Sequence, residues 1–328
     1  MFQQNSYKPH VQLSWYGKNA LKLLPSAVMA IISMVIAIFV TADFALAIAA
    51  IPLLIGILFT RPRKAKVAFV YTPRIKRMLA CEAILALGVA VGFIFASKLV
   101  LAAAVSFLYA FCPLFILAVN MINRPLELAI NRYYINDAKR IINESPNLTV
   151  IGITGSYGKT SVKYFLARLL AAKYETVMTP ENYNTTLGVV RTIRQSIRAT
   201  TEMFVCEMGA RNVGDIKEIC ELVKPKHGVI TAIGQQHMES FKTQDNIIRT
   251  KMELADSVAD RGMLFFNNEN EFLKNSPVKH ISYGISADCD FSAFGESVSQ
   301  NGTEFFVRTP NGESQRFSTK LIGRHNIV

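Results

Sequence analysis

Residues 149–161 read T-V-I-G-I-T-G-S-Y-G-K-T-S. The apolar run at 149–154 predicts a buried strand, and the pattern at 161–172 predicts a helix. A strand, a glycine turn and a helix in this order are the setting that a phosphate-binding loop requires. Gly155 and Gly158 let backbone N–H groups approach a polyphosphate, and the start of the helix adds a favourable dipole. The stretch therefore predicts an α/β domain that binds a nucleotide.

The loop differs from the generic phosphate-loop pattern, because Ile153 stands where that pattern has its first glycine. In the form found here, T-G-x-x-G-K-T, the Lys159 side chain can reach the β- and γ-phosphates and the Thr160 hydroxyl can bind Mg²⁺. A tight turn that merely precedes Lys-Thr is the alternative, and the flanking strand and helix patterns argue against it. The candidate nucleotide-binding residues of the loop are Thr154, Gly155, Ser156, Tyr157, Gly158, Lys159, Thr160 and Ser161.

The first half of the chain is strongly apolar. Hydrophobic residues form 51% of the 328 residues and charged residues only 18%, a composition that indicates membrane segments. The apolar blocks 23–59 and 78–119 are each long enough for about two crossings, which predicts a transmembrane region of about four helices. We place two of them at 23–40 and 44–59. A signal peptide and a buried helical core are the alternatives.

Charge is unevenly distributed between the two halves. Residues 1–150 contain 15 Lys/Arg and 5 Asp/Glu, whereas residues 151–328 contain 21 and 19. This argues against nucleic-acid binding by the second half and indicates basic loops beside a membrane. We expect a multi-pass protein of the inner or plasma membrane, with the lipid bilayer as a partner and the catalytic domain in the cytoplasm.

The expected domains are a cytoplasmic N-terminal segment at 1–22, transmembrane helices at 23–119, an amphipathic linker at 120–147 and an α/β phosphate-loop domain at 148–328. That domain is expected to contain a mainly parallel sheet with a small antiparallel addition. The addition is predicted because 303–309 and 315–320 flank Pro310-Asn311-Gly312, which is a hairpin signal.

Six further motifs follow the loop. They are E-N-Y-N-T-T-L-G at 181–188, C-E-M-G-A-R at 206–211, T-A-I-G-Q-Q-H-M-E at 231–239, T-K-M-E-L at 250–254, N-N-E-N at 267–270 and G-R-H-N at 323–326. In this order they resemble the ATP-binding central domain of the Mur ligase family, and the loop alone also resembles folylpolyglutamate synthases. The E-M-G-A-R segment is most similar to the branch that adds D-alanyl-D-alanine. The family's C-terminal ligase domain does not follow G-R-H-N, so we expect a truncated sequence.

The resemblance implies roles for particular residues. Glu207 would bind Mg²⁺ beside Thr160, and His237 would hold a second Mg²⁺. Lys251 would be carbamylated and help to hold that second ion, so the catalytic candidates are Lys159, Lys251 and His237. Substrate-facing and adenine-side candidates complete the set: Asn184, Thr185 and Thr186 for the acyl substrate, and Asn267, His325 and Asn326 for ATP.

The residue pattern agrees with part of this assignment. Residues 202–206 are strand-like and place Glu207 at a carboxyl end, and 227–232 place His237 in the loop beyond another strand. Ligands bind at the carboxyl ends of strands in open α/β sheets, so Lys159, Glu207 and His237 are expected to converge. Taken alone, a single glutamate, histidine or lysine at such a position is usually solvated.

The expected function is an ATP-dependent ligase that forms an amide bond through an acyl phosphate, with ATP and two Mg²⁺ ions. Its substrates would be a small-molecule cell-wall precursor and an amino acid or dipeptide, and no nucleic acid is expected. Other possibilities are a folylpolyglutamate-synthase-like amino-acid ligase, a transporter or regulator, and a non-catalytic nucleotide-binding membrane protein. Only Asp43, Glu82 and Lys98 are charged within the apolar blocks, which argues against a transporter.

Overall fold

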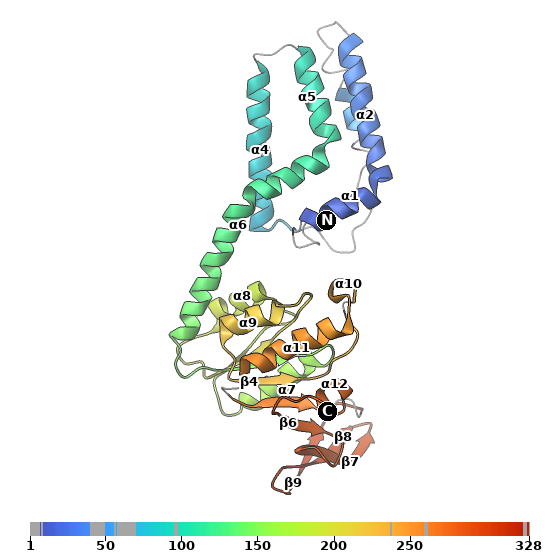
Figure 1. Ribbon diagram of the computed structural model, residues 1–328. Coiled ribbons are helices and arrows are strands. Elements are labelled where there is room, and N and C mark those ends of the chain that lie inside the picture. The colour runs from blue at the N-terminus through green and yellow to red at the C-terminus, as the bar shows by residue number, and fades with distance from the viewer. Residues whose placement is uncertain are drawn as a thin grey trace. The chain divides into compact units, whose positions relative to one another are not determined.

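The computed structural model divides into two compact units, Met1–Ile130 and Asn131–Val328. The description covers residues 7, 9–39, 50–55, 57, 70–94, 98–236, 238–258, 262–323 and 327. Each unit is built differently. The first is helical, whereas the second contains a nine-stranded sheet with helices around it (Figure 1).

The first unit is built from helices. They are α1 (Pro9–Lys18), α2 (Ala20–Phe39), α4 (Pro73–Ile94), α5 (Lys98–Ala110) and the first part of α6 (Cys112–Asn143). Helix α5 packs against both α2 and α4, and its Ser106 hydroxyl donates to the Ser33 hydroxyl of α2 over 3.0 Å. Arg77 of α4 forms a two-pronged ion pair with the buried Glu127 of α6, at 2.7 and 2.8 Å. Polar side chains therefore link these helices as well as apolar ones.

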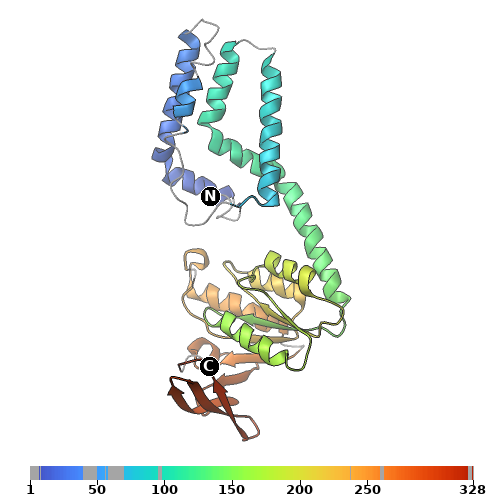
Figure 2. The ribbon, with the colours of Figure 1, turned by 180° about the vertical axis from the view of Figure 1, so that it is seen from behind.

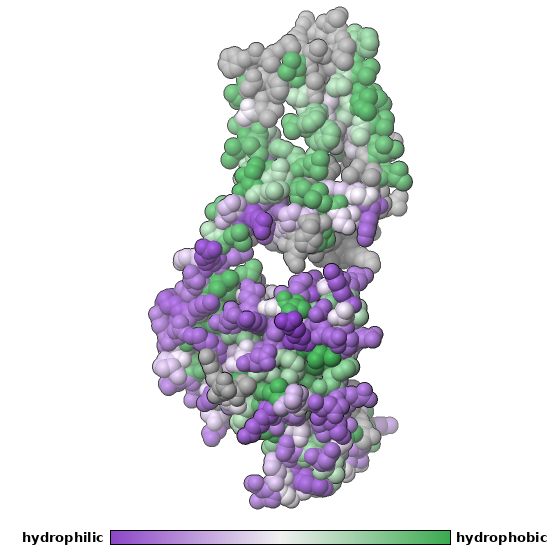
Figure 3. All heavy atoms as spheres, in the orientation of Figure 1, coloured by the Kyte–Doolittle hydropathy of each residue, from purple (hydrophilic) through white to green (hydrophobic). Residues whose placement is uncertain are grey.

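The expected transmembrane region is not supported. Hydrophobic residues do gather over the first unit (Figure 3). Among the described residues, however, no helix is both long enough and apolar enough to cross a bilayer. Helix α5 has 13 residues, about 20 Å, where a crossing needs about 30 Å. Helix α4 begins with a basic cluster, and α6 continues through the expected boundary at 119 into the charged segment.

Over the described residues, the expected transmembrane region and the multi-pass membrane location are therefore wrong, and the bilayer as a partner is not supported. Apolar composition over a block of sequence does not fix where the helices begin and end. The expected turn at Asp43 and most of the expected crossing at 44–59 lie outside the described residues.

The second unit contains one mixed sheet in the order β2-β3-β1-β4-β5-β6-β7-β8-β9. Neighbours from β2 to β7 pair in parallel, and β7, β8 and β9 pair antiparallel. The expected hairpin corresponds to β8 and β9. The strands are β1 (Thr149–Thr154), β2 (Thr176–Met178), β3 (Met203–Glu207), β4 (His227–Ile230), β5 (Leu264–Asn267), β6 (Ile281–Gly284), β7 (Phe291–Ser299), β8 (Gly302–Arg308) and β9 (Ser314–Thr319).

Helices cover both faces of the parallel part. They are α7 (Lys159–Leu170), α8 (Thr186–Ser196), α9 (Asp215–Val223), α10 (Met238–Phe241), α11 (Gln244–Val258) and α12 (Glu271–Lys274). Successive strand residues point to opposite faces. Val150 therefore joins the core under α8, α9 and α11, and Ile151 joins the core under α7. Helix α7, green in Figure 2, packs on β1, β2 and β3.

The order of the strands determines where the candidate site lies. Strand β1 lies between β3 and β4, and all three run parallel. Their carboxyl ends therefore share one edge of the sheet, where ligands bind in open α/β domains. The glycine loop follows β1, Glu207 ends β3, and Thr231 follows β4.

Candidate nucleotide-binding site

The loop after β1 depends on two glycines. Gly155 has φ +151° and Gly158 has φ +79°, values that favour glycine. A Cβ on Gly155 would lie 2.0 Å from the Thr231 hydroxyl oxygen, so no other residue fits there. Helix α7 begins directly after Gly158 with no side-chain cap hydrogen bond, so its first N–H groups are left to an incoming anion.

The loop is also tied to the segment after β4. The Ser156 N–H donates to the Ala232 carbonyl over 2.6 Å, and the Ser156 hydroxyl donates to the Gly234 carbonyl over 3.0 Å. The Thr231 hydroxyl donates to the Tyr157 carbonyl. The side chain of Ser156 therefore fixes the loop to its neighbour, while the N–H groups at the start of α7 remain for a ligand.

Lys159 lies across the loop. Its ammonium donates to the Gly155 carbonyl over 2.7 Å and to the Ser156 carbonyl over 3.3 Å. Burial lowers the pKa of Lys159, and the nearby Glu207 carboxylate opposes that shift. The ammonium is thus held at the edge of the loop, where it can meet a phosphate.

Glu207 is the most connected side chain of the site and is only 2% exposed. Its Oε2 accepts from the Thr160 hydroxyl at 3.1 Å and lies 3.0 Å from the Lys163 ammonium. Its Oε1 accepts from the Asn184 amide at 3.1 Å. The expected proximity of Glu207 to the glycine loop is therefore present in the structure.

Lys251 is buried on α11, although the charged sequence of that helix suggested a solvated face. It is 2% exposed, and among the described residues no carboxylate lies within 4.0 Å of its ammonium. Burial lowers the pKa of Lys251 to about 8, with a further lowering from the nearby charge of Lys159, while Glu253 and Asp215 oppose it. The neutral amine, the form that reacts with carbon dioxide, is therefore accessible near neutral pH.

We expect the burial of Lys251 to make stability depend on pH. The pKa of Lys251 is about 8 in the folded protein, against an ordinary value of 10.5 for a lysine, so between these values the unfolded chain binds more protons. The free energy of unfolding should therefore rise with pH in this window by about 3 kcal/mol, relative to Lys251→Met. Urea unfolding of both proteins from pH 7 to 10.5, in buffer free of carbon dioxide, measures this. A difference in unfolding free energy between the two proteins that does not change with pH would contradict this prediction.

Other candidate residues have different surroundings. The Thr154 hydroxyl, at the end of β1, donates to the Met208 carbonyl over 3.0 Å in a buried hydrogen bond. Thr185 caps α8 by accepting from the Gly188 N–H at 3.4 Å. Thr186 is the first residue of that helix. Three candidates, His237, His325 and Asn326, lie outside the described residues.

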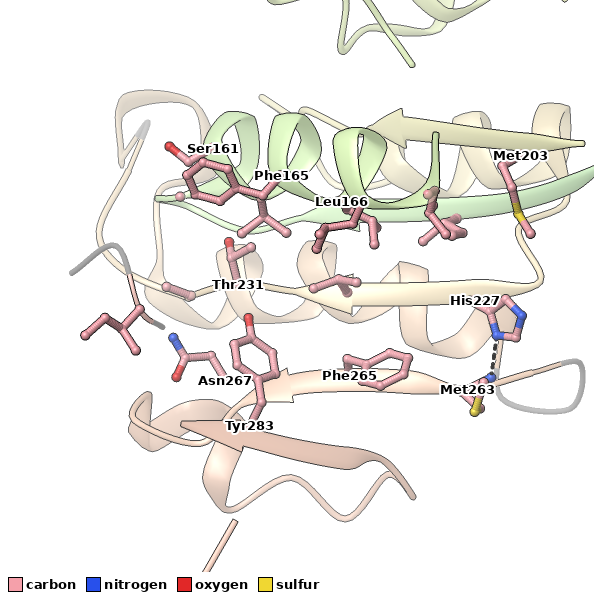
Figure 4. Close-up of a pocket in the computed structure, with 18 of the residues that line it drawn as sticks. Ser161, Phe165, Leu166, Met203, His227, Thr231, Met263, Phe265, Asn267 and Tyr283 are labelled. Carbon is pink, nitrogen blue, oxygen red and sulfur yellow. Dashed lines mark hydrogen bonds between the residues drawn. The ribbon is translucent and has the colours of Figure 1, made fainter. Parts of the chain in front are cut away.

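A cavity of about 890 Å³ extends from the loop along the sheet (Figure 4). Leu166 of α7 and Phe265 of β5 lie on opposite sides of it. Ser161, Thr231 and Asn267 lie toward one end, so the expected adenine-side residue shares a cavity with the start of α7. The lining between these ends is mainly apolar.

Two residues that the structure places in the site were not identified from the sequence. Lys163 pairs with Glu207, and Thr231 packs against Gly155. Lys163 follows Lys159 by one helical turn, and residues four apart share a helix face. That spacing is the signal that could have placed Lys163 beside the loop.

The donor set fits Mg²⁺ only if phosphate completes it. Thr160 and Glu207 supply oxygen atoms 3.1 Å apart. Mg²⁺ is usually held by one or two carboxylates together with substrate phosphates and water. Within the described part of the chain, no group of three or more acidic, histidine or cysteine side chains could hold a metal.

The glycine loop and the parallel strands around it define an α/β domain of the phosphate-loop class. Residues 153–328, more than half of the chain, match the Mur ligase middle domain. The chain therefore belongs to the Mur ligase family.

Relatives with assigned names point to one branch of this family. UDP-N-acetylmuramoyl-tripeptide--D-alanyl-D-alanine ligase of Bacillus subtilis is 30% identical over 180 residues, which cover 55% of this chain and 38% of the relative. The Escherichia coli enzyme of that name is 29% identical over 223 residues, 63% of this chain and 48% of the relative. The chain thus spans less than half the length of these relatives.

Solved structures of MurF are also similar to this chain. A crystal structure of MurF from Acinetobacter baumannii has a TM-score of 0.55 at 26% identity, covering 59% of this chain and 43% of that one. MurF from Thermotoga maritima, in complex with ADP, has a TM-score of 0.51 at 25% identity, covering 56% and 44%.

Proposed function

We propose that this chain is the ATP-binding part of a ligase that joins a carboxylate to an amine through an acyl phosphate. The substrate pair is a UDP-muramoyl-tripeptide and D-alanyl-D-alanine. The contact of Thr160 with Glu207 beside the glycine loop carries this proposal, because it places a metal-binding carboxylate next to a phosphate site. The names of the relatives support the choice of substrates.

Each candidate residue has a role in this proposal. The loop from Thr154 to Ser161 surrounds the triphosphate, with Lys159 at the β- and γ-phosphates. Asn267 faces the adenine side, in line with its place in the cavity. The remaining assignments are Asn184, Thr185 and Thr186 beside the acyl substrate, and His325 and Asn326 beside the adenosine.

The chemistry brings two anions together, the substrate carboxylate and the γ-phosphate. Phosphoryl transfer depends mainly on positioning and on neutralising charge. Lys159 and the N–H groups of α7 supply fixed positive charge on one side of the γ-phosphate. The carboxylate oxygen attacks phosphorus and ADP leaves; the amine then attacks the acyl carbon and phosphate leaves.

Thr160 and Glu207 would hold one Mg²⁺ against the phosphates, and His237 and Lys251 a second. A bound Mg²⁺ neutralises charge that develops on the phosphoryl oxygens. A carbamate on Lys251 would replace a repelling cation with an oxygen ligand. The lowered pKa of Lys251 supports this modification, because only the neutral amine adds to carbon dioxide.

The proposal is tested with the purified protein, ATP, Mg²⁺, UDP-muramoyl-tripeptide and D-alanyl-D-alanine. We expect phosphate release that requires both substrates, and a product whose mass equals the joined pair less water. Phosphate release that proceeds equally well without one of the two substrates would contradict the assignment of the reaction. Replacing the tripeptide substrate with folate and glutamate is the comparison for a folylpolyglutamate-like activity.

A further inference from the structure

Lys163 is a fully buried lysine that the proposed reaction does not yet use. Its side chain is 0% exposed, and its ammonium has two described oxygen partners. One is Oε2 of Glu207 at 3.0 Å, and the other is the Glu181 carbonyl. Removing an ammonium from water costs several kcal/mol unless a close partner offsets the cost. Glu207 is that partner.

Glu181, whose carbonyl is the second partner, begins a turn that also contacts Glu207 through Asn184. Glu181 has a left-handed backbone, φ +42°. Beyond it, the Asn184 carbonyl accepts from the Gly209 N–H at 2.7 Å, and the Asn184 amide donates to Glu207 Oε1 at 3.1 Å. A Cβ on Gly209 would lie 2.7 Å from the Asn184 side chain, so the turn packs tightly against Gly209.

These contacts fix both carboxylate oxygens of Glu207. Lys163 and Thr160 approach Oε2, and Asn184 approaches Oε1. Lys163 itself has no exposed surface from which to meet a ligand. Its effect on bound nucleotide or metal must therefore pass through Glu207 and through the turn at 181–185.

We propose that Lys163 is a positioning residue that assembles two parts of the site together. Its ammonium orients the Glu207 carboxylate toward the Thr160 hydroxyl, and its bond to the Glu181 carbonyl attaches the turn at 181–185 to α7. This inference rests on the proposed function, because it takes Glu207 as a Mg²⁺ ligand and the turn as the substrate-facing segment.

Lys163→Met keeps the length of the side chain and removes its charge. Arg168→Met is the matched control, because Arg168 is an exposed cation on the same helix. We expect Lys163→Met to raise the Mg²⁺ concentration that half-saturates nucleotide binding by about tenfold, as loss of a residue that orients a metal ligand does. Affinity for ATP in EDTA should stay within about twofold, because Lys159 and the α7 N–H groups remain.

A purely structural role would weaken binding with and without Mg²⁺ alike. An unchanged Mg²⁺ dependence in Lys163→Met, or an equal loss under both conditions, overturns the proposal. The control should match the wild type in both measurements. A wild-type protein that binds no ATP would instead contradict the proposed function.

Hydrogen exchange tests the same contacts without nucleotide. In Lys163→Met the amides of 181–187 should exchange at least about tenfold faster, while those of β1 and β3 stay protected. Unchanged exchange in the turn overturns the proposal.

The double variant Lys163→Met/Glu207→Gln covers the case in which the single variant does not fold. It removes both charges of the pair, so it should unfold at a higher denaturant concentration than Lys163→Met alone. A midpoint at or below that of the single variant overturns the ion-pair role.

Discussion

Lys159→Ala should lower ATP-dependent phosphate release by about a hundred- to a thousandfold, the usual effect of removing one fixed group that stabilises transition-state charge. The ammonium lies on the carbonyls of Gly155 and Ser156, at the edge of the loop. Its loss removes the positive charge that we propose meets the γ-phosphate but leaves both glycines in place. Phosphate release at saturating ATP and Mg²⁺, with both proposed substrates, measures the effect.

Lys173→Ala is the control, because Lys173 is an exposed lysine just beyond the other end of α7. It should behave like the wild type. Phosphate release within a few-fold of normal in Lys159→Ala would show that the glycine loop is not the site of phosphoryl transfer.

Glu207→Gln should have two effects, one on stability and one on metal dependence. The substitution leaves the Lys163 ammonium buried without a charged partner. Breaking a buried pair by removing one partner typically costs about 3–5 kcal/mol, so the free energy of unfolding should fall by that amount. Mg²⁺ should also strengthen ATP binding less than in the wild type, because the carboxylate beside Thr160 loses its charge.

Denaturant unfolding and Mg²⁺ titration of ATP binding check the two effects separately. Glu221→Gln removes an exposed carboxylate from α9 and serves as the control. A Glu207→Gln protein with normal stability would contradict the buried ion pair. A normal Mg²⁺ dependence would remove Glu207 from the metal site.

The sequence predicted those parts of the second unit that depend on local pattern. The expected strand at 149–154 coincides with β1, and the predicted helix overlaps α7. The approach of Glu207 to the loop was also foreseeable, because parallel strands bring their carboxyl ends to one edge. The register of β1 with β3, which pairs Ile153 with Glu207, produces that approach.

The sequence did not predict features that arise from contacts between distant segments. Lys251 taken alone suggested a solvated cation, and Lys163 was not singled out at all. The burial of both depends on contacts with β3 and on the packing of α11. Glu253 likewise accepts from the Gly214 N–H at 2.7 Å, near the start of α9, which no local pattern indicated. In the first unit, apolar composition misled because it carries no information about the length of each helix.

A crystal structure of the protein with Mg²⁺ and a non-hydrolysable ATP analogue would show whether the glycine loop and Glu207 hold the nucleotide and its metal ion. We expect the triphosphate to lie on the N–H groups of Gly158, Lys159 and Thr160, with Lys159 Nζ at the γ-phosphate and Mg²⁺ between Thr160 and Glu207. A nucleotide bound elsewhere, or a metal ion away from Glu207, would contradict it.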